Sequence, residues 1–256
     1  MANRSILRYP GGKFRARNLI ANMFDESIKT VASPFFGGGS VELELADRGK
    51  VVYAAELFKP VAFLWQQVKE NPSKLVRKVE SFLGKDRSEF YSLQKELRNE
   101  LDKEEPDSFK CAWMCFVINR TSFSGATLSG GIGDGKRFTK GSIEQILKVD
   151  LSSINIRQGD YWDVLFSRGQ TYDAVYADPP YLVGSSLYGN KGNVHKEFDH
   201  ERFATHIKGL NCYVVVSYND CDAIRELFQG WRVETVKWSY GMNQSKKSNE
   251  ILITNG

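Results

Sequence analysis

The sequence of 256 residues lacks the marks of several protein classes. No apolar run approaches the ~20 residues that a membrane helix needs, and the N-terminus has no hydrophobic segment of the secretory kind. Histidine and cysteine are scarce, with three and four residues, and no CxxC pair occurs. Neither a disulfide framework nor a zinc site is therefore indicated, and we expect a cytoplasmic protein with no membrane and no metal partner.

The sequence also has little excess of one charge, because the formal net charge is only +4. The positive residues are nevertheless grouped. The first 24 residues contain no acid and hold five basic residues, Arg4, Arg8, Lys13, Arg15 and Arg17. Lys136, Arg137 and Lys140 form a second group, and Lys246 and Lys247 a third. Local basic groups on a near-neutral chain are typical of phosphate contacts, although scattered solvated lysines are the commoner alternative.

Strand and helix patterns alternate at both ends of the chain. Helices are predicted at 15–26 and from 41 to a stop at Gly49, and strands at 30–36 and 51–55. The alternation resumes with strands at 155–157, 172–177 and 213–217 and helices at 201–209 and 222–228, before a strand pair at 234–238 and 250–254. This order predicts an α/β fold with a Rossmann-like, doubly wound sheet.

Residues 59–150 interrupt that alternation. Their apolar spacing predicts helices at 61–69, 74–83, 90–101 and 109–118, with no strand between them. Residues 119–141 are then polar and rich in glycine, and a loop of that length in a folded protein is usually functional or mobile. The sequence therefore predicts one doubly wound domain from 1–58 and 151–256, split by a mostly helical insertion at 59–150.

The apolar strand at 172–177 ends in Asp178-Pro179-Pro180-Tyr181. Proline has no backbone N–H, so this corner offers carbonyl and carboxylate acceptors together with one flat ring. Open α/β sheets bind ligands at the carboxyl ends of their strands, and a planar substrate with an exocyclic amino group would suit such acceptors. The alternative is a strand that merely ends at proline.

A glycine turn follows the first strand, in Phe35-Phe36-Gly37-Gly38-Gly39-Ser40, and Glu56 ends the second strand about 20 residues later. Glycines let a ligand approach the backbone, and an acid at that distance accepts hydrogen bonds from a ribose. A dinucleotide fingerprint would need glycine at position 42, where Glu42 stands and would repel a pyrophosphate. S-adenosylmethionine, a cationic nucleoside without a pyrophosphate, fits this pattern better.

Two other patterns are weak. The segment 130–137 matches the spacing of a phosphate-binding loop, but Arg137 replaces the metal-binding Ser or Thr and no strand precedes it. His195, His200 and His206, with Asp199, do not fall on one helix face, so they are interpreted as ordinary polar residues and not as metal ligands.

Taken in order, the stretches 7–13, 33–40, 54–56, 119–125, 177–181 and 250–253 resemble the adenine-N6 DNA methyltransferases of the Dam family, which form the D12 class. Their order, with the cofactor motif first, a target-recognition insertion next and Asp-Pro-Pro-Tyr last, is the α-type arrangement of that family. The resemblance implies that 1–58 and 151–256 form the S-adenosylmethionine-binding catalytic domain and 59–150 the target-recognition insertion. The Asp-Pro-Pro-Tyr corner alone would admit other amino-methyltransferases, whereas Arg8-Tyr9-Pro10-Gly11-Gly12-Lys13 and Asn119-Arg120-Thr121-Ser122-Phe123-Ser124-Gly125 make the resemblance more specific.

The resemblance implies a site-specific enzyme that moves a methyl group from S-adenosylmethionine to a flipped adenine in duplex DNA and leaves S-adenosylhomocysteine. It implies a catalytic corner of Asp178, Pro179, Pro180 and Tyr181. It implies a cofactor pocket of Tyr9, Pro10, Lys13, Phe35, Gly37, Gly39, Glu56, Asp160, Tyr161 and Asp178. Tyr9 stands where the family usually has Trp, and Glu56 where it usually has Asp.

For DNA contacts the family and the basic groups point to Arg8, Asn119, Arg120, Ser122, Ser124, Lys136 and Arg137. Members that read GATC usually continue after residue 125 with a Tyr-Arg-rich run, and here the segment 126–131 differs, so GATC or a related short site is expected. The alternatives are an RNA adenine or DNA cytosine-N4 enzyme, a non-catalytic DNA-binding module and a nicotinamide dehydrogenase. We expect a monomer in the cytoplasm of a bacterial or phage-infected host cell.

Overall fold

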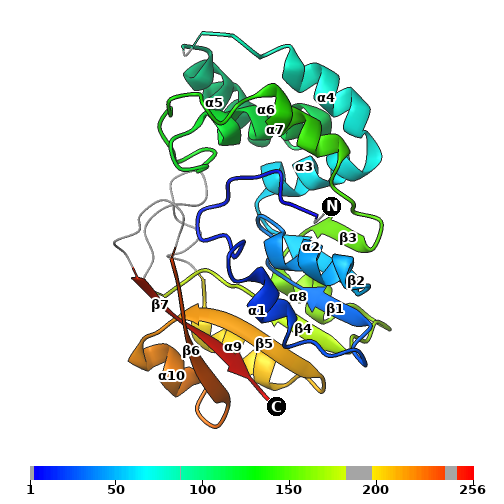
Figure 1. The fold of residues 1–256 in the computed structure, drawn as a ribbon, viewed down its shortest axis with the longest axis vertical. Coiled ribbons are helices and arrows are strands. Elements are labelled where there is room, and N and C mark those ends of the chain that lie inside the picture. The colour runs from blue at the N-terminus through cyan, green and yellow to red at the C-terminus, as the bar shows by residue number, and fades with distance from the viewer. Residues whose placement is uncertain (1–2, 87, 183–197, 240–246) are drawn as a thin grey trace.

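The computed structural model describes residues 3–86, 88–182, 198–239 and 247–256, and its strands form one seven-stranded sheet (Figure 1). The spatial order is β3-β2-β1-β4-β5-β7-β6. The strands are β1 (Thr30–Ser33), β2 (Val51–Glu56), β3 (Ile154–Gln158), β4 (Ala174–Ala177), β5 (Tyr213–Asn219), β6 (Arg232–Ser239) and β7 (Lys247–Thr254). All neighbours are parallel except β7, which runs antiparallel to β5 and β6. The predicted doubly wound sheet and its closing antiparallel pair are confirmed.

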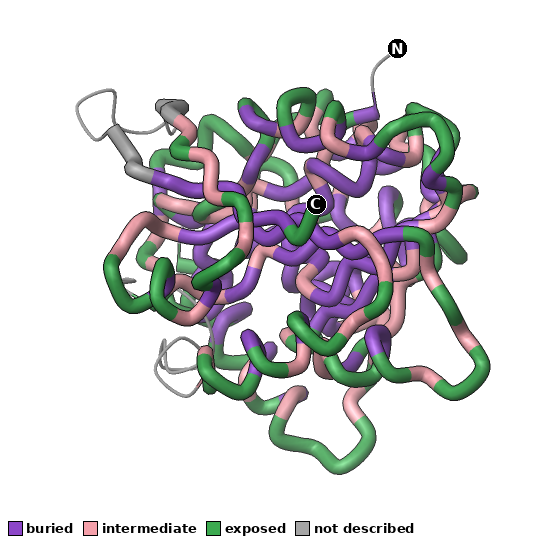
Figure 2. The backbone as a smooth tube through the Cα atoms, turned by 90° about the horizontal axis from the view of Figure 1, so that it is seen from below, coloured by how far each residue is buried: buried purple, intermediate pink, exposed green. Residues whose placement is uncertain are grey.

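The central strands are apolar on both faces, because alternate residues enter two different cores. Val31 of β1 packs with α1 (Arg17–Ala21), α2 (Ser40–Asp47) and α3 (Lys59–Glu70) on one face. Its neighbour Ala32 packs with α8 (Tyr161–Leu165), α9 (His200–Lys208) and α10 (Asp222–Leu227) on the other. Figure 2 shows the result, a buried interior with exposed chain at the periphery. Because alternate side chains of each strand pack on opposite faces, the strand tips are fixed between two helical layers.

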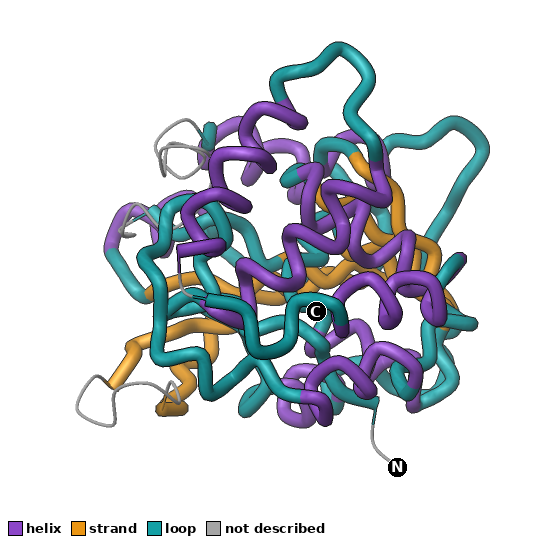
Figure 3. Tube along the Cα trace, turned by 90° about the horizontal axis from the view of Figure 1, so that it is seen from above, coloured by secondary structure: helices purple, strands orange, loops and turns teal. Residues whose placement is uncertain are grey.

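The insertion between β2 and β3 is helical, as predicted. Beyond α3 it contains α4 (Pro72–Glu80), α5 (Ser88–Leu101), α6 (Ser108–Thr121), α7 (Lys140–Glu144) and a short 3₁₀ turn, Gln145–Leu147. The helices lie at one end of the molecule, in front of the strands when viewed from above (Figure 3). None of the helices in the described ranges has the length and apolar character needed to cross a membrane.

The predicted boundary at residue 59 does not separate two cores. Helix α3 packs against β2 and β3 on one side and against α6 on the other. One continuous apolar cluster contains Val52 of the sheet together with Leu93 of α5 and Phe116 of α6. The insertion is therefore packed onto the sheet through α3, which serves both parts of the chain.

The glycine-rich segment 119–141 is held in place by α5. The Gln94 side-chain amide donates to the carbonyl oxygens of Thr127 and Gly130 at 2.8 and 2.9 Å. A short antiparallel bridge joins Ser122 to Ile132 at the base of the segment. Because Gln94 is itself buried, its two hydrogen bonds fix the backbone of the segment against α5.

Several element boundaries differ from the prediction. The helix predicted at 15–26 is only α1, and the strand predicted at 30–36 stops at Ser33, immediately before Pro34. Two short helices, α7 and α8, were not predicted. Each begins with a capping box, at Thr139 and at Asp160, in which a side chain at the third helical position bonds back to the cap.

Candidate active site

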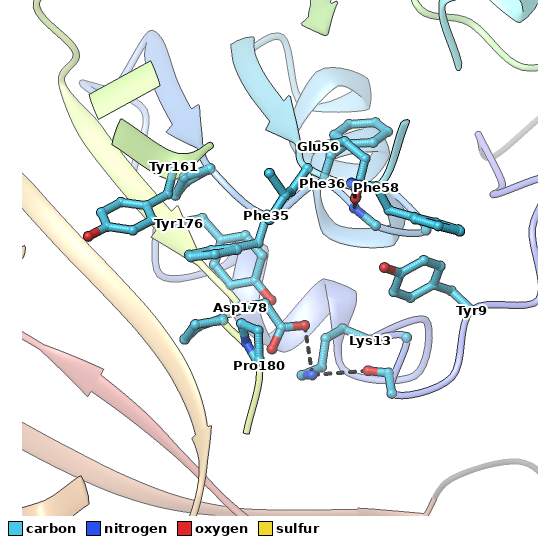
Figure 4. Close-up of a pocket in the computed structure, with 18 of the residues that line it drawn as sticks. Tyr9, Lys13, Phe35, Phe36, Glu56, Phe58, Tyr161, Tyr176, Asp178 and Pro180 are labelled. Atoms are coloured by element: carbon cyan, nitrogen blue, oxygen red, sulfur yellow. Dashed lines mark hydrogen bonds and ion pairs between the residues drawn. The ribbon is translucent and has the colours of Figure 1, made fainter. Parts of the chain in front are cut away.

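A cavity of about 730 Å³ opens at the carboxyl ends of the parallel strands β1, β2, β3 and β4, where doubly wound sheets place ligands (Figure 4). Its lining includes every residue predicted for cofactor binding, namely Tyr9, Pro10, Lys13, Phe35, Gly37, Gly39, Glu56, Asp160, Tyr161 and Asp178. It also includes the rest of the predicted catalytic corner, Pro179, Pro180 and Tyr181. The structure thus brings these residues together, while their individual roles stay predictions.

Asp178 lies at the tip of β4 with both carboxylate oxygens engaged. Its Oδ1 accepts a hydrogen bond of 2.6 Å from the Ser217 hydroxyl, and its Oδ2 accepts one of 2.8 Å from the Lys13 ammonium. Figure 4 shows Lys13 and Asp178 pointing toward each other from the N-terminal arm and from β4. Each carboxylate oxygen has a second lone pair, so Asp178 can still accept from a ligand. Its orientation is fixed before any ligand arrives.

Ser217 was missed in the sequence. It is fully buried on β5 and follows the apolar run Val214–Val216, just as Asp178 follows the apolar run of β4. Because β4 and β5 are parallel neighbours, polar residues that follow their apolar runs meet at the same edge of the sheet. A polar residue directly after an apolar strand is thus the sequence pattern that could have identified Ser217.

Tyr181 stands beside the ammonium of Lys13, whose Nζ lies 5.0 Å from the centre of the ring. The ring also packs against Tyr218, at 6.2 Å between centroids and a tilt of 36°. Burial, followed by the nearby Asp178 and Glu250 carboxylates, raises the pKa of Tyr181 well above its usual value. The hydroxyl therefore stays protonated at neutral pH, and the side chain acts as a neutral flat surface.

The glycine turn is shaped by the aromatic side chains packed on it. Gly37 and Gly39 have φ of +50° and +67°, which favour glycine. A Cβ at Gly37 would lie 2.8 Å from the Tyr9 ring, and one at Gly39 would lie 2.7 Å from the Phe36 ring. The predicted reason for these glycines was close approach of a ligand. The structure gives a second reason, since Tyr9 and Phe36 occupy the space where side chains would be.

Glu56 holds the same turn from the tip of β2. Its two carboxylate oxygens accept from the backbone N–H groups of Gly37, at 2.8 Å, and Phe58, at 2.7 Å. Burial raises the pKa of Glu56 to about 7, against the opposing effect of those two donors. On the far side of the turn, the Trp65 indole donates to the Gly37 carbonyl at 3.0 Å. Glu56 therefore orders the turn and also presents a carboxylate to the cavity.

An aromatic wall closes the cavity near β3. The rings of Phe35 and Tyr161 stack at 5.9 Å with 29° between their planes. The Tyr161 hydroxyl and His206 Nδ1 are 2.9 Å apart, which fixes the orientation of the phenol. Asp160 caps α8, accepting from the Trp162 N–H at 3.0 Å, and still lines the cavity. A flat apolar wall beside a carboxylate suits a nucleobase.

The residues predicted to contact DNA divide into two sets. Asn119 and Ser122 are each only 1% exposed. The Asn119 amide donates to the carbonyls of Arg8 and Gly125 and accepts from the Arg8 N–H, at 3.0, 2.7 and 3.0 Å. Ser122 donates to the Asn119 carbonyl at 3.0 Å. Asn119 therefore ties the N-terminal arm to the segment 119–141, and Ser122 bonds within that segment. Neither side chain faces solvent, whereas Ser124 is half-buried.

The remaining residues form a basic cluster, which we define as Arg8, Arg120 and Arg137. Burial, together with the charges of Arg8 and Arg137, lowers the pKa of Arg120 to about 10. Burial and Arg137 also lower the pKa of Arg8, although Asp134 opposes this. The cluster therefore concentrates positive charge from the arm, α6 and the segment 119–141. Arg137 is the exposed member of the cluster, and its neighbour in sequence, Lys136, is exposed as well.

The weaker sequence patterns gain no support as sites. His200 Nδ1 and the Tyr218 hydroxyl lie 2.8 Å apart, and His206 contacts Tyr161, whereas His195 lies outside the described residues. Over the ranges described, no group of three or more His, Cys, Asp or Glu side chains could hold a metal ion. The segment 130–137 follows a loop and not a strand.

Comparison with known proteins gives one family. The sequence model of the D12 class N6 adenine-specific DNA methyltransferases matches residues 9–242. The Type II methyltransferase M1.LlaDCHI of Lactococcus lactis subsp. cremoris is 24% identical over 98% of this chain and 95% of its own length.

Solved structures give weaker likenesses. A SAM-dependent methyltransferase from Agrobacterium tumefaciens has a TM-score of 0.42 and 13% identity, covering 94% of this chain and 61% of that one. Magnesium protoporphyrin IX methyltransferase from Synechocystis has a TM-score of 0.39 and 10% identity, covering 96% of this chain and 81% of that one.

Proposed function

Since the chain belongs to the D12 class of N6 adenine-specific DNA methyltransferases, we propose that it methylates the exocyclic nitrogen of an adenine flipped out of duplex DNA at a short specific site. The observation that carries this proposal is the Asp178 carboxylate, fixed by Ser217 and Lys13 at the mouth of a nucleoside-sized cavity. GATC or a related sequence is the proposed class of target.

S-adenosylmethionine is the methyl donor, and the cavity residues fit it. When bound, it supplies an electrophilic methyl group. Glu56 accepts hydrogen bonds from the ribose, in the position that an acid at the tip of the second strand takes in nucleotide-binding sheets. The stacked pair of Phe35 and Tyr161 forms the wall for the adenine ring of the donor. Tyr9 covers the glycine turn from the arm.

The target adenine is held by its amino group. Its N6 lone pair is delocalised into the ring, so the nitrogen is a poor nucleophile. Hydrogen bonds from N6–H to the Asp178 carboxylate and the Pro179 carbonyl favour the pyramidal nitrogen and stabilise the positive charge that develops on it as the N–C bond forms and the methyl–sulfur bond of the donor breaks. The extra proton then passes from N6 to water. Because Asp178 is already oriented, little reorganisation accompanies this step.

Flipping the base has an unstacking cost of about a few kcal/mol. Stacking of the extruded base on Tyr181 returns roughly 1–3 kcal/mol, by analogy with single-strand binding proteins. The raised pKa of Tyr181 keeps that surface neutral, so it does not repel the electron-rich base.

The basic cluster and Lys136 contact DNA phosphates. Like-charged guanidinium groups held close together are stabilised when an anion neutralises them, and phosphate geometry matches the guanidinium fork. Arg8 and Arg120 bind backbone oxygens of the segment 119–141 through some of their donors, which directs the rest of each group. We assign sequence readout to this segment and positioning to the cluster.

The test of the function is transfer of tritiated methyl groups from S-adenosylmethionine to duplex DNA, followed by digestion and nucleoside analysis. The expected product is N6-methyladenine, at a site that sequencing of the methylated DNA identifies. Label in N4-methylcytosine, or a digest without N6-methyladenine, contradicts the proposal.

The double substitution Lys136→Ala and Arg137→Ala tests the phosphate contacts. We expect the slope of log K against log salt for duplex binding to fall by about 2, since each lost contact removes close to one released counterion. Fluorescence anisotropy at several salt concentrations measures it. The control is Lys208→Ala with Arg232→Ala, two exposed basic residues outside the segment 119–141. Equal slopes for the two double variants contradict the assignment.

A further inference from the structure

Glu42 is a buried acid for which neither the family motifs nor the proposed mechanism has a use. It lies in the first turn of α2, directly after the glycine turn, and is 2% exposed. The Ser33 hydroxyl donates to its Oε1 at 2.6 Å, and the side chain lines the cavity. A carboxylate loses much of its hydration when it is buried in this way. The ionised form is therefore stable only with a positive charge nearby.

The surroundings of Glu42 belong to the methyl-transfer end of the cavity. The charged groups that act on it are Asp178 from β4 and Lys13 from the N-terminal arm. The buried Tyr176 of β4 lies in the field of Glu42, Asp178 and Glu250. Glu56, at the ribose end, lies in a different environment and is influenced by Phe58 and Gly37. Glu42 is therefore placed near the reacting centre and away from the ribose.

Negative charge exceeds positive charge at this end of the cavity. In the described part of the chain, Glu42, Asp178 and Glu250 surround the one ammonium group of Lys13, which lies 2.8 Å from Asp178 and 3.8 Å from Glu250. Lys13 and Glu250 have side chains only 3% and 1% exposed, so water screens them little. This end of the cavity is therefore suited to receive a cation.

We propose that Glu42 determines the preference of the pocket for S-adenosylmethionine, which carries a sulfonium cation, over the product S-adenosylhomocysteine, whose sulfur is neutral. The proposal rests on the proposed function, because it requires that the cavity binds the methyl donor. Both molecules have the same ribose, base and amino-acid tail, so the groups that hold those parts cannot discriminate between them. A carboxylate facing the sulfur can, and loss of the sulfonium charge on transfer then favours product release.

The direct test is calorimetric titration of the wild-type chain and of Glu42→Gln with the two molecules, without DNA. Glutamine keeps the shape and can accept from Ser33. We expect Kd for S-adenosylmethionine to rise about tenfold, equivalent to about 1.4 kcal/mol, and Kd for S-adenosylhomocysteine to change less than twofold. Equal weakening of both overturns the proposal and indicates a contact with the shared ammonium tail. No weakening of either overturns it as well.

Glu44→Gln is the matched control. Glu44 lies two residues further along α2, outside the cavity lining, where it pairs with Arg48 at 2.9 Å and with Arg17 at 3.4 Å. The Glu44→Gln substitution removes the same charge from the same helix. We expect both dissociation constants to stay within twofold of wild type. If the wild-type chain itself fails to bind S-adenosylmethionine, the proposed function has failed and not the assignment of Glu42.

Two pH measurements give independent readouts. Burial, partly opposed by the Ser33 hydrogen bond, raises the pKa of Glu42 from 4.5 to about 7. The wild-type ratio of the two dissociation constants should therefore shift toward S-adenosylmethionine between pH 6 and 8, while the Glu42→Gln ratio stays flat. The ratio cancels titration of groups that the two molecules share.

The second readout is stability without ligand. A raised carboxyl pKa gives stability that is present below 4.5 and is lost as the pH rises through about 7. Glu42→Gln should thus raise Tm at pH 8 and leave it unchanged at pH 5. A variant that melts higher but binds the donor less tightly supports the proposal, and a lower Tm at pH 8 contradicts it.

Discussion

Asp178→Ala is expected to reduce methyl transfer by at least ~10²–10³-fold, the range found when one preorganised electrostatic contact to a transition state is removed. The substitution takes away the carboxylate that accepts from N6–H and leaves only the Pro179 carbonyl. Single-turnover transfer to duplex DNA measures the effect on the chemical step. Wild-type turnover in this variant contradicts the role assigned to Asp178.

Asp178→Ala also takes the nearest acceptor from the buried Lys13 ammonium, which still has the Gly11 carbonyl at 3.0 Å and the Glu250 carboxylate at 3.8 Å. A loss of about 1–3 kcal/mol in unfolding free energy is therefore expected, and urea unfolding measures it separately from methyl transfer. Ser217→Ala, which deletes one donor but keeps the carboxylate, is the milder control and should lower the rate about tenfold.

Gly125→Ala is expected to cost about 2–4 kcal/mol of unfolding free energy and to weaken duplex binding and methylation together. Gly125 has φ of +80°, and an added Cβ would lie 1.9 Å from the Arg8 carbonyl oxygen. That oxygen also accepts from Asn119, so the arm must move. Because the same arm carries Tyr9 and Lys13 into the cavity, a displacement at Arg8 reaches the site. Urea unfolding and the methylation assay measure the two effects.

Gly135→Ala is the matched control. It lies in the same segment with φ of +75°, and an added Cβ there meets nothing within 4 Å. Its cost should be the backbone strain alone, about 1–2 kcal/mol, with normal duplex binding. If the two glycine variants prove equal, the contact between Gly125 and the arm does not anchor the segment.

The fold and the membership of the cavity could be predicted because both depend on short, strong local signals. Gly37–Gly39, Glu56 and Asp178 each follow an apolar strand, and parallel strands bring their ends to one edge. Ser217 also follows an apolar strand, but no distinctive motif surrounds it, so its sequence does not predict a role in the site. For Glu42 the sequence indicates only that a pyrophosphate would be repelled. Its burial against Ser33 depends on the packing of α2 on β1, which local sequence does not predict.

The environment of the residues predicted to contact DNA could be predicted less well, for a physical reason. A polar side chain in a glycine-rich segment can bond equally to a ligand or to the backbone nearby. The Asn119 side-chain amide uses its oxygen and both N–H groups on Arg8, near the N-terminus, and on Gly125, just beyond α6. Spacing in the sequence carries no information about a partner 111 residues away. Arg8 and Arg137 could be predicted because they belong to basic groups in the sequence, whereas Arg120 was predicted from the family stretch 119–125.

The position of α3 has a consequence for protein engineering. Trp65 on this helix donates to the glycine turn of the cofactor cavity. The same helix packs on α6, whose last turn carries Asn119, the residue that bonds to the arm. The insertion at 59–150 is consequently not packed as a separate module. A chimera that takes the insertion of another family member should therefore also take α3 and residues 3–13, because a seam at residue 59 or 71 cuts through the shared core. If the insertion reads the target sequence, as we propose, an exchange of target specificity also alters the donor cavity of this chain.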